Sequence, residues 1–174
     1  MTRDAVVAGA AVRAAWESSR ILAPETSNTQ REQARRLVQE VMDTHGNGEV
    51  ARGSVFLAGV LAAYLTRDAG SPGAIDPLED LIPTVIRKLS AFETADPAQA
   101  PMASGVLTAA VLGQDAVAWR DQYGPVPPTE ALNHTFVIWL LSDLLDFSLE
   151  KPGAADEIMQ ETFASIATEE GTTS

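Results

Sequence analysis

The chain has 174 residues, of which 45% are hydrophobic and 21% are charged, and these values suit one water-soluble domain with a core of its own. Cysteine is absent, which excludes disulfides, Cys-ligated zinc, iron–sulfur clusters and thiol nucleophiles. The formal charge of −12 disfavours contact with the phosphate backbone of DNA or RNA and favours basic partners.

The first part of the chain predicts three helices, over about 3–22, 30–44 and 49–68. Helix-forming residues dominate these segments, and Pro and Gly fall mostly between them. Thr2 is the expected cap of the first helix. The third segment is apolar on every side through 55–65, which predicts a helix that is buried on every side. At 11 residues this run is too short for a membrane span, which needs about 20.

The middle of the chain carries a strong helix start at Asp76-Pro77-Leu78-Glu79, with a capping acid, proline at the first helical position and Glu two residues later. Pro83 follows, and proline inside a helix removes a hydrogen bond and clashes with the preceding turn. The pattern therefore predicts either a short turn at 77–81 and a helix at 83–93, or one kinked helix.

The last part predicts three more helices, over 97 or 100 to 123, 130–150 and 155–168, with a frayed tail at 169–174. The resulting fold is all-α: a single domain over 1–174, with about seven helices in an antiparallel bundle or in stacked helical hairpins. The third, fifth and sixth helices are the expected interior. The narrow apolar stripe of the seventh helix predicts a peripheral position.

Three polar residues lie on the sixth predicted helix where apolar residues are expected. Asn133 and His134 fall on its apolar side, and Glu130 precedes His134 by one helical turn and is positioned to pair with it. The favoured interpretation is structural, with His134 bonded to a neighbouring backbone carbonyl. The alternative is a ligand-binding or general-base histidine, since neutral histidine suits both roles.

A second group of polar residues gathers on the opposite side of that helix. Asp143, Asp146 and Glu150 lie within two turns of one another, and three carboxylates at this spacing suit Mg²⁺. A solvated helix face is the favoured interpretation, so no metal and no cofactor is predicted. Trp139 lies in the same strip, where it either packs under the seventh helix or is exposed as an interaction residue.

Arg31, Arg35 and Arg36 form a small basic cluster on the second predicted helix. Glu32 and Glu40 lie at the i,i+4 spacing from Arg36, which favours ion pairs on the helix surface. We therefore expect a face whose charges are paired within the helix.

These patterns favour a soluble, cytoplasmic interaction or regulatory protein without catalytic chemistry of its own. Its expected partner is another protein or a second copy in a homodimer, with no nucleic acid and no membrane. One alternative is a small-molecule-binding domain with a pocket near Asn133 and His134. A second alternative is a small helical enzyme that uses Glu130 and His134, or Mg²⁺ held by the acidic cluster.

Overall fold

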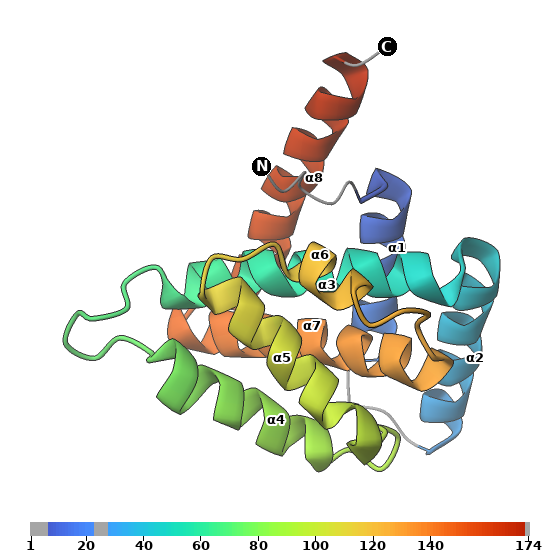
Figure 1. Cartoon of the computed structure of the whole chain (residues 1–174), viewed down its shortest axis with the longest axis horizontal. Coiled ribbons are helices and arrows are strands. Elements are labelled where there is room, and N and C mark those ends of the chain that lie inside the picture. The colour runs from blue at the N-terminus through green and yellow to red at the C-terminus, as the bar shows by residue number, and fades with distance from the viewer. Residues whose placement is uncertain (1–6, 23–27, 173–174) are drawn as a thin grey trace.

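The computed structural model describes residues 7–22 and 28–172, which form eight α-helices and no strand (Figure 1). The all-α prediction is confirmed. The predicted start of the first helix at Arg3 and its cap Thr2 lie outside the described residues. The helices are α1 (Gly9–Ile21), α2 (Asn28–His45), α3 (Asn47–Thr66), α4 (Ile82–Ser90), α5 (Ala100–Val111), α6 (Ala116–Asp121), α7 (Pro128–Ser148) and α8 (Ala154–Thr172).

Two short turns of other helical types precede α4 and α5, a π turn at Pro77–Leu81 and a 3₁₀ turn at Pro97–Gln99. Each begins at an aspartate whose carboxylate accepts backbone N–H groups: Asp76 from Leu78 and Glu79, and Asp96 from Ala98. The start signal read from the sequence at Asp76 is therefore present, Asp96 starts the 3₁₀ turn in the same way, and the segment around Pro83 is a turn followed by a helix.

The predicted helix over 97–123 is two helices, and this prediction was wrong. Gly113 has φ +73°, a left-handed conformation that ends α5 and that glycine adopts without strain. The carboxylate of Asp115 then accepts the N–H of Ala118 and starts α6. The sequence contains both the glycine that ends α5 and the aspartate that starts α6, but the long apolar segment before them favoured one continuous helix.

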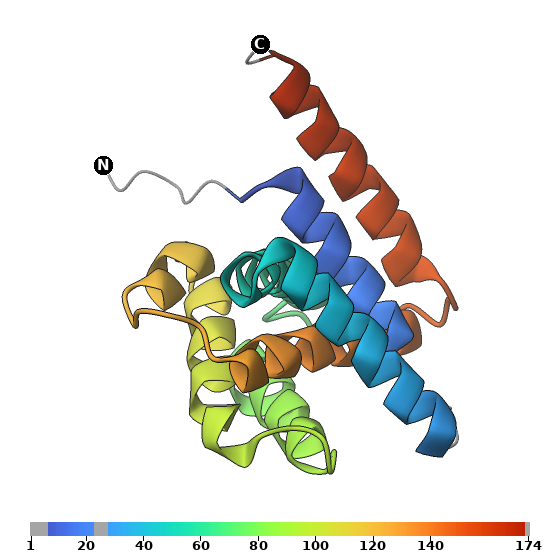
Figure 2. The same cartoon turned by 90° about the vertical axis from the view of Figure 1, so that its right-hand side faces the viewer.

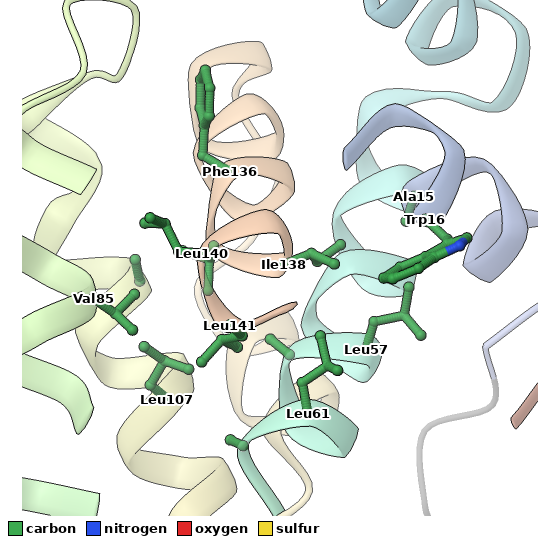
Figure 3. Packing of buried hydrophobic residues seen from close by; sticks show 14 of the residues in the cluster. Ala15, Trp16, Leu57, Leu61, Val85, Leu107, Phe136, Ile138, Leu140 and Leu141 are labelled. Carbon is green, nitrogen blue, oxygen red and sulfur yellow. The ribbon is translucent and has the colours of Figure 1, made fainter. Parts of the chain in front are cut away.

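The core is built around α3 and α7, which pack on each other more extensively than any other pair of described helices. Figure 3 shows α7 between two groups of helices: Leu140 and Leu141 point toward Val85 and Leu107, whereas Ile138 points toward α3. Because α7 is covered from both sides, its apolar residues surround the helix. The predicted central positions of 49–68 and 130–150 agree with this packing.

In Figure 1, α3 and α7 both begin beside α2 and cross the molecule in the same general direction. α1 packs against α3 and α7, and α5 packs against both of them from the other side. The buried residues of α5 lie on one side of it: Ala103, Val106, Leu107 and Ala109. α5 is therefore less enclosed than predicted.

By length and composition α3 is apolar enough to cross a membrane. However, 56% of its most apolar 18-residue segment is buried inside this chain. The central helix of a water-soluble protein meets the same criterion. The burial of α3 therefore agrees with a soluble domain. The prediction of burial on every side was wrong, because Ala63 is exposed and Phe56 and Val60 line an open depression.

α8 is peripheral, as predicted, and projects from the body of the molecule beside α1 (Figures 1 and 2). The guanidinium of Arg13 on α1 lies over the ring of Phe163, 4.8 Å from its centroid. α8 continues to Thr172, beyond the predicted end at Thr168, and residues 173–174 lie outside the described part.

The crossing of α1 and α3 depends on the absence of a side chain at Gly53. A Cβ atom built at this glycine would lie 2.5 Å from the carbonyl oxygen of Ala11. That neighbour is backbone within a helix, so it has no rotamer with which to move away. The two helix axes approach closely because position 53 is glycine.

We predict that Gly53→Ala lowers the free energy of unfolding by about 1–3 kcal/mol, the usual penalty for overpacking a core. Gly48→Ala in the same helix is the matched control, since a Cβ there meets nothing within 4 Å. The control variant should be as stable as the wild type or more stable by up to about 1 kcal/mol. Urea denaturation measures both, and equal stabilities of the two variants would contradict the close approach.

Candidate functional site

Three polar side chains at the start of α7 are buried, with exposed fractions of 2% for Glu130, 1% for Asn133 and 1% for His134. Buried polar groups without partners are costly, at about 1–3 kcal/mol each. Whether these residues form a reactive site or a structural one depends on where their hydrogen bonds go.

Glu130 is bound by a buried arginine. Nε of Arg120 donates to Oε1 of Glu130 at 2.5 Å, and Nη2 donates to Oε2 at 2.8 Å. This two-point geometry is the strongest form of a carboxylate–guanidinium pair. Nη1 of Arg120 also donates to the carbonyl of Gly124 at 2.6 Å. The arginine thus joins α6, the connection after it and the first turn of α7.

His134 completes this cluster, with Nε2 3.1 Å from Oε1 of Glu130. Burial alone would raise the pKa of Glu130, but the hydrogen bonds from His134 and Arg120 outweigh burial and lower it from 4.5 to about 2. Glu130 is therefore ionised at neutral pH and only accepts hydrogen bonds, so Nε2 of His134 carries the proton. The predicted pairing of Glu130 with His134 is present, and a carboxylate takes the place of the expected backbone carbonyl.

Asn133 makes a separate contact that connects α7 to the start of α5. Its Oδ1 accepts the N–H of Asp96 at 3.0 Å, and its Nδ2 donates to the carbonyl of the same residue at 2.8 Å. The side chain reproduces the pairing that a second backbone strand would offer. Both polar ends of Asn133 are used within the protein.

These contacts favour the structural interpretation of the cluster. A general base must reach the proton that it removes, directly or through one water molecule. The side chains of Glu130 and His134 are 3% and 2% exposed and already bonded to each other. The geometry therefore suits a clamp that holds α6, α7 and the 97–99 turn together.

Arg120 was not predicted as a site residue, although one feature of the sequence pointed to it. Arg120 is the sole lysine or arginine between Lys88 and Lys151. A buried carboxylate at position 130 needs a cation, and Arg120 is the nearest in the chain. Treating 97–123 as one continuous helix hid the turn that brings Arg120 back toward α7.

The acidic residues near the end of α7 have different roles. The carboxylate of Asp146 accepts the N–H groups of Gly153 and Ala155, both at 2.8 Å, and so caps the start of α8. Asp143 lies 3.8 Å from Nζ of Lys88 on the surface. Glu150 has φ +50° at the residue after the C-cap of α7, where glycine is usual.

These residues line an open depression of about 660 Å³. Its walls are Asp143, Asp146, Phe147, Ser148, Glu150 and Pro152. Phe147 is the most exposed large hydrophobic residue of the described chain, with 82% of its surface accessible. Its side chain is therefore exposed at a depression that three acidic residues also line, and we call this set of residues the Phe147 surface.

Trp139 is not the exposed aromatic of this face. It is half-buried against the core, and its ring meets that of Phe92 edge-on with 5.8 Å between centroids. Phe92 in turn stacks on Phe136 at 5.0 Å. Phe147 lies in the same polar strip, four residues after Asp143, and a phenylalanine among these acidic residues is the feature of the sequence that indicates an exposed aromatic side chain.

Within the described residues no group of three or more His, Asp or Glu side chains is arranged to hold a metal ion. The acidic cluster is thus not drawn together as the Mg²⁺ alternative requires. A separate apolar depression of about 560 Å³ lies between α3, α5 and α6, lined partly by small residues such as Gly59, Ala63 and Ala110. Neither Asn133 nor His134 lines it.

Comparisons with protein-family models, with curated proteins and with solved structures found no match to this chain.

We predict that Glu130→Gln lowers the free energy of unfolding by about 3–5 kcal/mol, because Arg120 stays buried without its counter-charge. Glu157→Gln is the control, since Glu157 pairs with Lys151 on the surface with both side chains more than half exposed. It should cost at most about 1 kcal/mol. Chemical denaturation at pH 7 compares them, and similar losses would contradict the clamp.

The depressed pKa of Glu130 also predicts a pH dependence. Because its pKa is lower in the folded protein (about 2) than its ordinary value of 4.5, its contribution to stability is complete above pH 4.5. The contribution is lost as the pH falls from 4.5 toward 2. The stability difference between wild type and Glu130→Gln should therefore shrink over this window, and a constant difference would show that Glu130 is not the ionised partner.

Proposed function

We propose that this protein is an interaction module that uses the Phe147 surface to bind a partner protein. The observation that carries the proposal is the 82% exposure of Phe147 within a depression lined by three carboxylates. Aromatic residues are enriched where proteins meet, and burying one phenylalanine side chain contributes about 1.5–3 kcal/mol.

The position of Phe147 supports the proposal because the backbone around it is held in place. The N–H of Glu150 donates to the carbonyl of Phe147, and the N–H of Lys151 to that of Asp146, which closes the end of α7. The Asp146 carboxylate holds the next turn. A surface that is ordered before binding loses less entropy when it binds.

The chemistry of the surface indicates the partner. Asp143 and Glu150 are exposed acids on either side of the phenylalanine. The complement is an apolar hollow with basic residues at its rim, because opposite charges at the edge speed association and exclude other partners. The net charge of −12 supports a protein partner over a nucleic acid. We also place the protein in the cytoplasm, which fractionation of the source cell tests.

A photo-crosslinker tests the proposal when a benzoyl-phenylalanine replaces Phe147, since the change keeps an aromatic side chain there. We expect a crosslink in the source cell to one defined polypeptide, joined at a basic segment that mass spectrometry identifies. The same substitution at Tyr123, which is 57% exposed on the connection after α6, is the control.

The crosslink at position 147 should disappear when Asp143→Lys and Glu150→Lys are added. The crosslink at Tyr123 should not reproduce it. If position 147 yields no product, or the same products as position 123, the Phe147 surface is not a binding surface.

A further inference from the structure

We propose that the partner of the Phe147 surface is a second copy of this chain, which receives it in a basic groove beside the start of α7. This inference rests on the proposed function of the Phe147 surface. It adds the identity of the partner and a direction of assembly, because the two surfaces lie at opposite ends of one helix.

The receiving site is an open groove of about 440 Å³ between α2 and the first turns of α7, which we call the Arg35 groove. Val38 and Met42, both buried, and the half-buried Leu132 are its apolar residues. Its polar and rim residues are Glu32, Arg35, Arg36, Gln39, Pro128 and Thr129. An apolar floor with basic side chains above it is the complement that the Phe147 surface requires.

Arg35 and Arg36 differ from the other cations of the chain. In the part of the chain that the structure describes, neither makes an ion pair or a side-chain hydrogen bond, so the predicted pairs of Arg36 with Glu32 and Glu40 are not formed. The remaining lysines and arginines whose side chains are described each contact an acid, a hydroxyl or an aromatic ring.

The charges of the two surfaces have opposite sign. The Arg35 groove has two arginines against one acid, Glu32. The Phe147 surface has three carboxylates: Asp143 lies within ion-pair distance of Lys88, and Arg20 interacts electrostatically with Asp143 and Asp146. In a chain of net charge −12, an acidic face is common but a groove with two unpaired arginines is an exception.

One molecule cannot join its own two surfaces. Pro128 and Thr129 of the groove begin α7 and Phe147 ends it, and a helix of 21 residues is roughly 30 Å long. The Phe147 surface of one copy must therefore enter the Arg35 groove of another. Such a contact joins two different patches, so repeating it gives a ring or an open chain in place of a symmetric dimer.

Only the residues lining the two depressions are assigned to this contact, far fewer than the roughly 20–30 on each side of a standard interface, so we expect a weak contact that exchanges rapidly. We expect a dissociation constant of roughly micromolar order or weaker. Since exposed charges supply the complementarity, the association should weaken as salt is raised from about 0.05 to 0.5 M, where the screening length falls well below 10 Å.

Sedimentation velocity over a concentration series tests the inference with three variants of the full chain. The first reverses the groove (Arg35→Glu with Arg36→Glu), the second reverses the acidic end (Asp143→Lys with Glu150→Lys), and the third combines all four changes. All four residues are exposed. Circular dichroism verifies that each variant keeps the helical fold.

We expect wild-type protein to form species larger than a dimer, and each two-residue variant alone to associate at least about tenfold more weakly. Mixing the two variants should restore species larger than a dimer in which the variants alternate, because the native end of the first fits the native groove of the second and the reversed groove of the first fits the reversed end of the second. The four-residue variant should associate again, since both of its surfaces have exchanged sign. Restored association cannot arise from a folding defect.

A wild-type protein that stays monomeric at all accessible concentrations overturns the inference, and so does a four-residue variant that fails to regain association while the wild type associates. The crosslink at position 147 then distinguishes the two proposals. A crosslink to a different protein retains the proposed function and rejects self-assembly, whereas no specific crosslink rejects both.

Discussion

The ion pair between Arg120 and Glu130 is the interaction on which the arrangement of α7 depends. Two charges removed from water destabilise a protein unless their geometry compensates, and here both carboxylate oxygens and two nitrogens of the guanidinium are engaged. Because Arg120 belongs to α6 and also binds the carbonyl of Gly124, the pair determines where the connection ends and α7 begins. The apolar packing of α7 on its neighbours would tolerate small slides along the helix; a buried two-point ion pair does not.

That constraint has consequences along the whole helix. With its first turn held by Glu130 and with Asn133 bound to the backbone of Asp96, α7 is anchored to α6 and to the start of α5. Its last turn is joined to α8 through the carboxylate of Asp146. The helix therefore acts as a rigid spacer between the Arg35 groove at its start and the Phe147 surface at its end. α7 contributes residues to both, so their separation and relative direction follow from helix geometry and from the packing of α2 beside the start of α7.

The all-α class and most of the helices could be predicted from local signals, because caps, prolines and apolar periodicity act over a few residues. Asp76 was identified in this way, whereas the predicted burial of α3 on every side was wrong because Phe56, Val60 and Ala63 lie along an open depression. The break between α5 and α6 was missed although Gly113 and Asp115 were visible, since an apolar run of this length favours one helix.

Arg120 could be suspected only by asking which cation a buried Glu130 requires. The exposure of Phe147 depends on which sides of α7 other helices cover, and that is decided by packing between distant segments.

The end of α7 shows a local conflict that stability alone does not explain. Glu150 occupies a left-handed conformation at a position where glycine is favoured, and a non-glycine residue there loses stability of about 1 kcal/mol. Phe147 exposes an aromatic ring one turn before it, with no packing gain inside the chain. Beside the start of α7, Arg35 and Arg36 on α2 form no ion pair with Glu32 or Glu40 of the same helix. Departures from the locally favoured choice are expected where a surface serves binding in addition to folding. Their occurrence at both ends of α7, with opposite charge, is the observation behind the proposed contact between copies of the chain.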